Sequence, residues 1–110
     1  MKNLSLCLLI ALALGLASPA LAKDFGSSKD VQQIKALVKS KFGQVANVSV
    51  SHDWAMCISN FEDSDLTVLL HRVNGRWTVV ARDGGAYRAE DLRAKGVPAG
   101  DISQLLKTYQ

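Results

Sequence analysis

The amino-acid sequence predicts an α+β fold in which one helix precedes a four-stranded antiparallel β-meander and two short helices end the chain. The prediction rests on two changes of hydrophobic period along the 110 residues. Apolar residues recur at helical spacing up to Gly43, alternate with a period of two over 45–83, and return to helical spacing after Gly84-Gly85. We expect strands over about 45–51, 54–60, 65–73 and 76–83, and C-terminal helices over about 89–95 and 101–109.

Residues 1–22 have the pattern of a secretory signal peptide. A basic start at Lys2 is followed by an uncharged apolar run over 4–16, and Ala20-x-Ala22 supplies the small residues of a cleavage site. A membrane anchor needs a longer run of about 18–20 apolar residues. We therefore expect cleavage after Ala22, one small domain over 23–110, and a periplasmic or secreted protein.

The charge balance of the predicted mature chain is nearly even. Removal of Lys2 leaves 12 basic and 10 acidic residues, a net charge of +2. The basic residues are dispersed and do not alternate with aromatic residues, so we expect no nucleic-acid partner and no membrane binding after cleavage.

The first helix is predicted to begin at Ser28 as N-cap and to end at Gly43. One apolar stripe runs along it, formed by Val31, Ile34, Leu37, Val38 and Phe42. The lysines between these positions are typical of a solvated face.

The first two strands are expected to share one buried face. Placing Val50 opposite Trp54 and Val48 opposite Met56 puts both apolar sets together and leaves residues 51–53 as a three-residue loop. Residues 60–64 then form a polar connection to the third strand.

The third and fourth strands form the central hairpin, closed by the two-residue turn Asn74-Gly75. Its register places Leu70 opposite Val79 and Val68 opposite Ala81, and places Arg72 where its guanidinium reaches Trp77. The core face collects Leu66, Val68, Leu70, Trp77, Val79 and Ala81. The mixed outer face collects Thr67, Leu69, His71, Val73, Arg76, Thr78, Val80 and Arg82.

The C-terminal segment reads as two helices separated by Gly96 and Pro98. Asp101 is predicted to cap the last helix, whose apolar residues need the sheet or the end of the first helix as a surface. Those residues are Ile102, Leu105, Leu106 and Tyr109.

A helix before a meander resembles the cystatin-like and NTF2-like folds, which host many functions. The motifs W-A-M-C, L-L-H-R-V-N-G-R-W-T-V-V, G-G and L-R-A-K-G-V-P-A-G-D-I-S-Q-L-L are similar to those of small exported bacterial proteins of unassigned function. Some of that group are labelled copper-uptake-system-associated. The similarity covers roughly 54–106 and implies the fold and the exported setting, not a metal site.

Metal-binding candidates are few. Cys57 is the single cysteine of the mature chain, which precludes an internal disulfide. The predicted register places Cys57 and His71 together on the outer face, Met56 on the core face and His52 at a loop tip. Two soft ligands on one face suit Cu(I), but no C-x-x-C, H-x-H or Met-rich spacing accompanies them. No cofactor is predicted.

No catalytic residues are predicted, because neither a nucleophile elbow nor a phosphate-binding loop is present. The sequence favours a non-enzymatic accessory or binding protein that contacts another envelope protein or itself; an inhibitor or immunity-type protein belongs to this class. The expected partner surface is the mixed outer face around Leu69, His71, Val73, Thr78 and Val80. The alternative is a periplasmic carrier of copper or of a small ligand.

Overall fold

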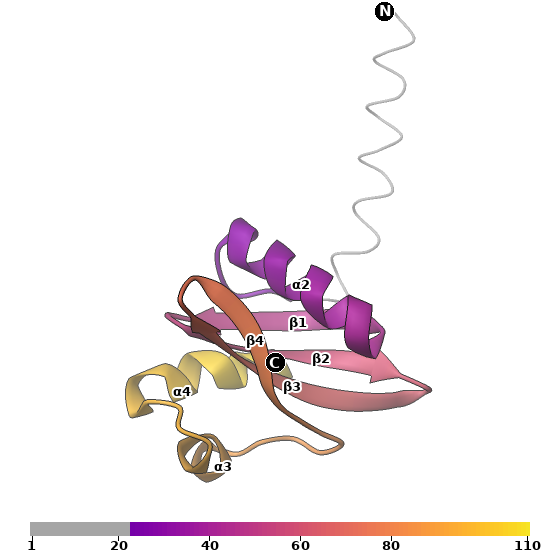
Figure 1. The fold of residues 1–110 in the computed structure, drawn as a ribbon. Coiled ribbons are helices and arrows are strands. Elements are labelled where there is room, and N and C mark those ends of the chain that lie inside the picture. Colours follow the sequence, from indigo (N-terminus) through magenta and orange to yellow (C-terminus); the bar gives the residue numbers. More distant parts are fainter. Residues whose placement is uncertain (1–22) are drawn as a thin grey trace, which may run out of the picture.

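The computed structural model of the chain describes residues 23–110, so the predicted signal peptide lies outside the described residues. It confirms the predicted α+β fold: a helix, an antiparallel meander and short C-terminal helices (Figure 1). The elements are α2 (Ser28–Phe42), β1 (Gln44–Ser51), β2 (Trp54–Phe61), β3 (Ser64–Val73), β4 (Arg76–Asp83), α3 (Ala89–Ala94), α4 (Ala99–Leu105) and the 3₁₀ helix η2 (Leu106–Tyr109).

The strands lie in the order β1-β2-β3-β4, so within residues 23–110 each of the four pairs with no other strand than its neighbours in the sequence. Every connection between them is a two-residue turn: 52–53, 62–63 and 74–75. At the last turn Asn74 and Gly75 have φ of 53° and 78°, the left-handed conformation that the Asn-Gly pair predicts.

Helix α2 is capped one residue earlier than predicted. The Ser27 hydroxyl accepts a hydrogen bond from the Asp30 amide at 3.2 Å, so Ser27 and not Ser28 is the N-cap. Gly43 ends the helix as expected, with φ 88°. A Cβ at Gly43 would lie 2.3 Å from the carbonyl oxygen of Asn60, so only glycine allows β1 to leave the helix this close to β2.

The predicted register of β1 against β2 is wrong by one residue near the turn, and a bulge between Ala46 and Ser49 restores it further on, where Ala46 pairs with Ile58. Val50 pairs with Ala55 and Ser49 with Met56, and the turn has two residues instead of three. The prediction assumed one buried face, whereas apolar side chains are buried on both faces of this sheet. Met56 therefore faces away from Val50, and Cys57 takes the place beneath α2.

The hairpin register holds near the turn and fails beyond it. Leu70 pairs with Val79 as predicted, but the next pair is Leu69 with Ala81, which leaves Val80 as an extra residue in a β-bulge. Because of the bulge, Ala81 packs on the opposite face from the one predicted.

The two faces of the sheet carry separate cores. Helix α2 covers one face, and the C-terminal helices cover the other (Figure 1). The core under α2 contains Val31, Ile34, Val38, Val48, Val50, Ala55, Cys57, Val68, Leu70 and Trp77. The core under the C-terminal helices contains Trp54, Met56, Leu69, Tyr87, Leu92, Val97, Ile102 and Leu105.

The last helix differs from the prediction at its start. It begins at Ala99 with Pro98 as N-cap, so Asp101 lies inside the first turn and does not cap the helix. The predicted helix over 101–109 is α4 followed by the short 3₁₀ helix η2. The displaced Asp101 carboxylate points toward the β1–β2 turn, where it takes part in the candidate site.

Candidate functional site

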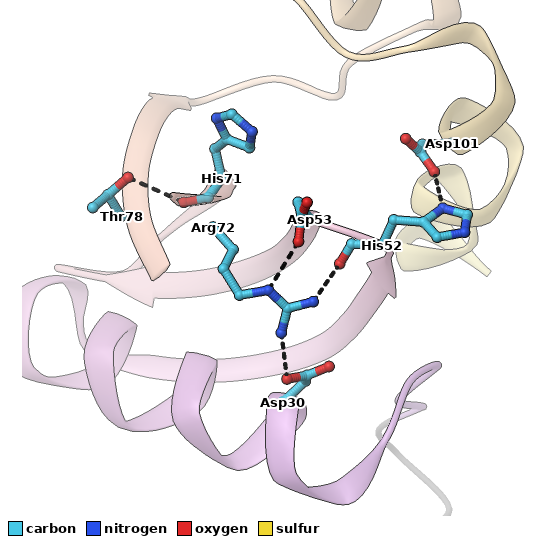
Figure 2. Close-up of polar contacts among 7 residues, drawn as sticks. All are labelled: Asp30, His52, Asp53, His71, Arg72, Thr78 and Asp101. Atoms are coloured by element: carbon cyan, nitrogen blue, oxygen red, sulfur yellow. Dashed lines mark hydrogen bonds and ion pairs between the residues drawn. The ribbon is translucent and has the colours of Figure 1, made fainter. Parts of the chain in front are cut away.

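Arg72 on β3 joins three elements at one end of the sheet (Figure 2). Its Nη1 donates to Asp30 Oδ1 on α2 at 2.9 Å, and its Nε donates to Asp53 Oδ1 in the β1–β2 turn at 3.0 Å. Its Nη2 donates to the carbonyl oxygen of His52 at 3.0 Å. The guanidinium lies 4.6 Å from the Trp77 ring centroid, which confirms the predicted cation–π contact. With three nitrogens bonded, Arg72 serves to hold the turn against the helix.

A buried carboxylate lies beside the same turn. Asp101 Oδ1 accepts hydrogen bonds from Ser51 Oγ at 2.7 Å and from His52 Nδ1 at 2.6 Å. Asp101 is only 6% exposed, whereas the side chain of His52 is 85% exposed. The imidazole therefore presents its other nitrogen to water while a buried acid fixes its orientation.

The hydrogen bond and the negative charge of Asp101 raise the pKa of His52 above 6.5. Burial raises the pKa of Asp101, but the hydrogen bonds from His52 and Ser51 outweigh it and lower the pKa below 3.8. The cluster is thus an ion pair at mildly acid pH. It is not a nucleophile–base arrangement, because Ser51 donates to the carboxylate and not to the imidazole.

His71, the other histidine, stacks on Trp54 of the neighbouring strand. The ring centroids are 4.0 Å apart and the planes differ by 12°. Thr78 on β4 donates to the carbonyl oxygen of His71 at 3.1 Å (Figure 2). His71 is therefore a half-buried edge of the core under the C-terminal helices.

The predicted pairing of Cys57 with His71 on one face is wrong. Cys57 is fully buried under α2, where burial raises the pKa of its thiol to about 12. His71 lies on the opposite face, stacked on Trp54, and His52 is at the turn. Met56 lies in the core under the C-terminal helices. Within residues 23–110, no three His, Cys, Asp or Glu side chains are grouped closely enough to hold a metal ion.

The predicted partner surface divides between core and solvent. Leu69 is fully buried under the C-terminal helices, so it is not part of any surface, and His71 is half-buried. Val73 and Val80 are 47% and 48% exposed, and Thr78 is exposed. The accessible part of the predicted surface therefore lies on β4, the last strand of the sheet, and at the end of β3.

The Ser51–His52–Asp101 cluster was not predicted from the sequence. Its acid and its histidine are 49 residues apart, and Asp101 reads as a helix cap. The signal that was present is the run Ser49-Val50-Ser51, in which serines occupy every second position of a strand. Because both faces of the sheet are covered, those hydroxyls are buried and need partners.

A second polar cluster fastens the C-terminal end. The Tyr87 hydroxyl donates to Asp83 Oδ2, and burial together with this bond raises the pKa of Tyr87. The Tyr109 hydroxyl accepts from the Tyr87 amide at 2.8 Å and lies 3.0 Å from Thr67 Oγ1. An open depression of about 330 Å³ adjoins this cluster between the end of β4 and α3.

No protein-family model matches the chain, and no curated protein or solved structure matches it. Among residues 23–110, none of the helices has the length and apolar character needed to cross a bilayer.

Proposed function

We propose that this chain is a small exported binding protein, which acts in the cell envelope by contacting another protein through strand β4 and does not catalyse a reaction. An inhibitor or immunity-type protein is one form that such a function takes. The observation that carries the proposal is the combination of exposed apolar side chains with a strand edge that pairs with no other strand within residues 23–110.

Strand β4 ends the sheet, so its outer backbone groups lack a strand partner among the described residues. Such an edge is a template for pairing with another chain. Four side chains beside this edge are exposed and form what we call the β4 patch: Val73, Arg76, Thr78 and Val80.

The composition of the β4 patch favours a protein partner. Val73 and Val80 are two of the four large apolar side chains that are most exposed in residues 23–110. Arg76 adds a cation, and arginine beside apolar side chains is enriched in protein interfaces. The bulge at Val80 increases the twist of the strand. A twisted edge disfavours pairing with arbitrary strands and favours a partner whose shape matches it.

We do not extend the proposal to a metal carrier. Cys57 is protonated and buried on the face opposite His71, so the two soft ligands that suggested copper cannot approach one ion in this fold.

Site-specific photo-crosslinking in the producing cells tests the proposal. A photoreactive amino acid at Thr78 is expected to give a discrete adduct, whereas the same group at exposed Ser103 on α4 gives none. Val80→Asp should reduce the Thr78 adduct without lowering the melting temperature. Adducts of equal yield at both positions, or none at either, would contradict the proposal. An adduct of twice the chain mass identifies the partner as a second copy.

A further inference from the structure

The opposite edge of the sheet, strand β1, already binds an extended segment over half of its length. Residues 23–25, which we call the N-terminal strap, lie parallel to β1 and pair at Phe25 with Ser49. The Phe25 amide donates to the carbonyl oxygen of Val48, and the Val50 amide donates to the carbonyl oxygen of Phe25, both at 2.7 Å. The backbone of this edge therefore already forms the hydrogen bonds of an added strand.

Helix α2 forms an ion pair with an acidic side chain on the strap. Asp24 Oδ1 accepts from the Val48 amide at 3.0 Å, and Asp24 Oδ2 lies 2.9 Å from Lys35 Nζ. One carboxylate therefore bonds both the strand edge and the helix above it. Lys23 ends the strap, with its amide nitrogen 3.1 Å from Asn47 Oδ1.

Past a bulge in β1, where Asn47 has φ 54°, the strand edge continues over residues 44–46 without an occupant among residues 23–110. A groove of about 470 Å³ lies between α2 and the start of β1, lined by Gln32, Lys35, Ala36, Lys39, Gln44 and Val45. The helix residues follow one face at i, i+3, i+4 and i+7. This row is about 10 Å long, enough for about three residues of an extended strand.

Lys39 stands over the beginning of β1 as Lys35 stands over its middle. An acidic side chain on a strand added beside residues 44–47 would meet Lys39 as Asp24 meets Lys35. The charge of Lys35 is already paired with Asp24, so Lys39 gives the groove its positive charge, and Val45 gives it an apolar floor.

We propose that the start of β1 and the groove beneath Lys39 form a docking site for an extended acidic segment of another protein, which adds to the sheet in line with the N-terminal strap. This site lies at the edge opposite the β4 patch, so it goes beyond the function proposed above.

The test measures fluorescence anisotropy of a short labelled peptide, in which valine alternates with aspartate or glutamate, on the exported protein. The N-terminus of the protein is read by mass spectrometry. Lys39→Glu is expected to weaken binding by about fivefold, because an attraction becomes a repulsion. Lys41→Glu is the matched control, since it changes the same charge in the same last turn of α2 but lies outside the groove; it should change binding by less than about twofold.

Two further probes separate strand addition from simple charge attraction. Each carries N-methyl groups on one of the two alternating sets of residues, which removes amide donors and keeps the charge. Strand addition requires that one of the two probes loses binding and the other keeps it. Equal binding of both, equal effects of the two lysine variants, or a dimer mass by light scattering that Lys39→Glu abolishes would overturn the proposal. The β4 patch variants leave this binding unchanged, so the two proposals fail independently.

Discussion

Asp101 is the residue whose removal tests the reasoning about the cluster most directly. In Asp101→Ala, the hydroxyl of Ser51 loses its acceptor while it stays buried at 9% exposure. A buried hydroxyl left without a partner costs about 1–3 kcal/mol, and we expect the free energy of unfolding to fall by that amount. Urea unfolding followed by tryptophan fluorescence measures it.

A double-mutant cycle isolates the hydrogen bond. In a Ser51→Ala background no hydroxyl is left unsatisfied, so Asp101→Ala should cost less there by about 1 kcal/mol or more. An equal cost in both backgrounds would show that the buried hydroxyl does not depend on Asp101.

The same cluster predicts a pH dependence. Because the folded pKa of His52 is raised above 6.5, its contribution is complete below pH 6.5 and is lost as the pH rises through the folded value. Because the folded pKa of Asp101 is lowered, its contribution holds above pH 3.8 and is lost as the pH falls through the folded value. The pair therefore stabilises most between pH 3.8 and 6.5. An NMR titration should give a pKa of the His52 imidazole above 6.5, and Asp101→Asn should lower that pKa. A pKa of His52 at or below 6.5 in the unaltered protein would refute the contact with Asp101.

Three further predictions concern the fold. Gly43→Ala should lower the free energy of unfolding by about 3 kcal/mol or more in the urea assay, because the added Cβ strains the backbone and contacts a carbonyl oxygen. Gly75 has a similar φ but open space around it, so Gly75→Ala should lower the free energy of unfolding by only about 1 kcal/mol. Iodoacetamide at pH 8 should alkylate Cys57 at least about 100-fold more slowly in the native protein than in urea, since the thiol is buried; equal rates would place it at the surface. Leu69→Asp should leave the protein unfolded, as judged by circular dichroism, because Leu69 is fully buried. Val80→Asp should change the free energy of unfolding by no more than about 0.5 kcal/mol. A larger loss of stability in Val80→Asp than in Leu69→Asp would mean that the two residues are assigned to the wrong faces.

The elements of this fold could be predicted because their signals are local. The Asn74-Gly75 turn requires left-handed backbone at two adjacent positions, and few other pairs allow it. Gly43 likewise marks a helix end that the structure places within one residue of expectation. Strand boundaries followed from alternation, which needs no knowledge of distant contacts.

Register and face could not be predicted, because they depend on what covers the sheet. Placing Trp54 with Val50 is correct reasoning for a sheet with one buried face. The second core exists only because the last helix, some 50 residues later, packs on the other side. The bulge at Val80 has no local sequence marker, and it alone moves Ala81 between faces.

The candidate sites divide in the same way. The exposed half of the predicted surface, Val73, Thr78 and Val80, followed from alternation near a well-defined turn. Leu69 was assigned to the surface because the sequence does not show which face the last helix covers, and Cys57 was misplaced with the register of β2. The acidic-strand site on β1 depends on where α2 and the N-terminal strap lie in space, which no spacing in the sequence encodes.

The order of the strands bears on how the chain reaches its native state from the unfolded form. Each strand pairs with the next through a two-residue turn, so the meander needs only short loops to close and should form quickly. Docking of the C-terminal helices onto β1 closes a much longer loop, because Ser49 and Thr108 are 59 residues apart in the sequence. Until that closure, Trp54 and Leu69 face water, so the interval before it is when the chain is most exposed to aggregation. We expect refolding monitored by Trp54 fluorescence, in a Trp77→Phe variant, to lag behind strand formation seen by circular dichroism, and simultaneous signals would show that both cores form together.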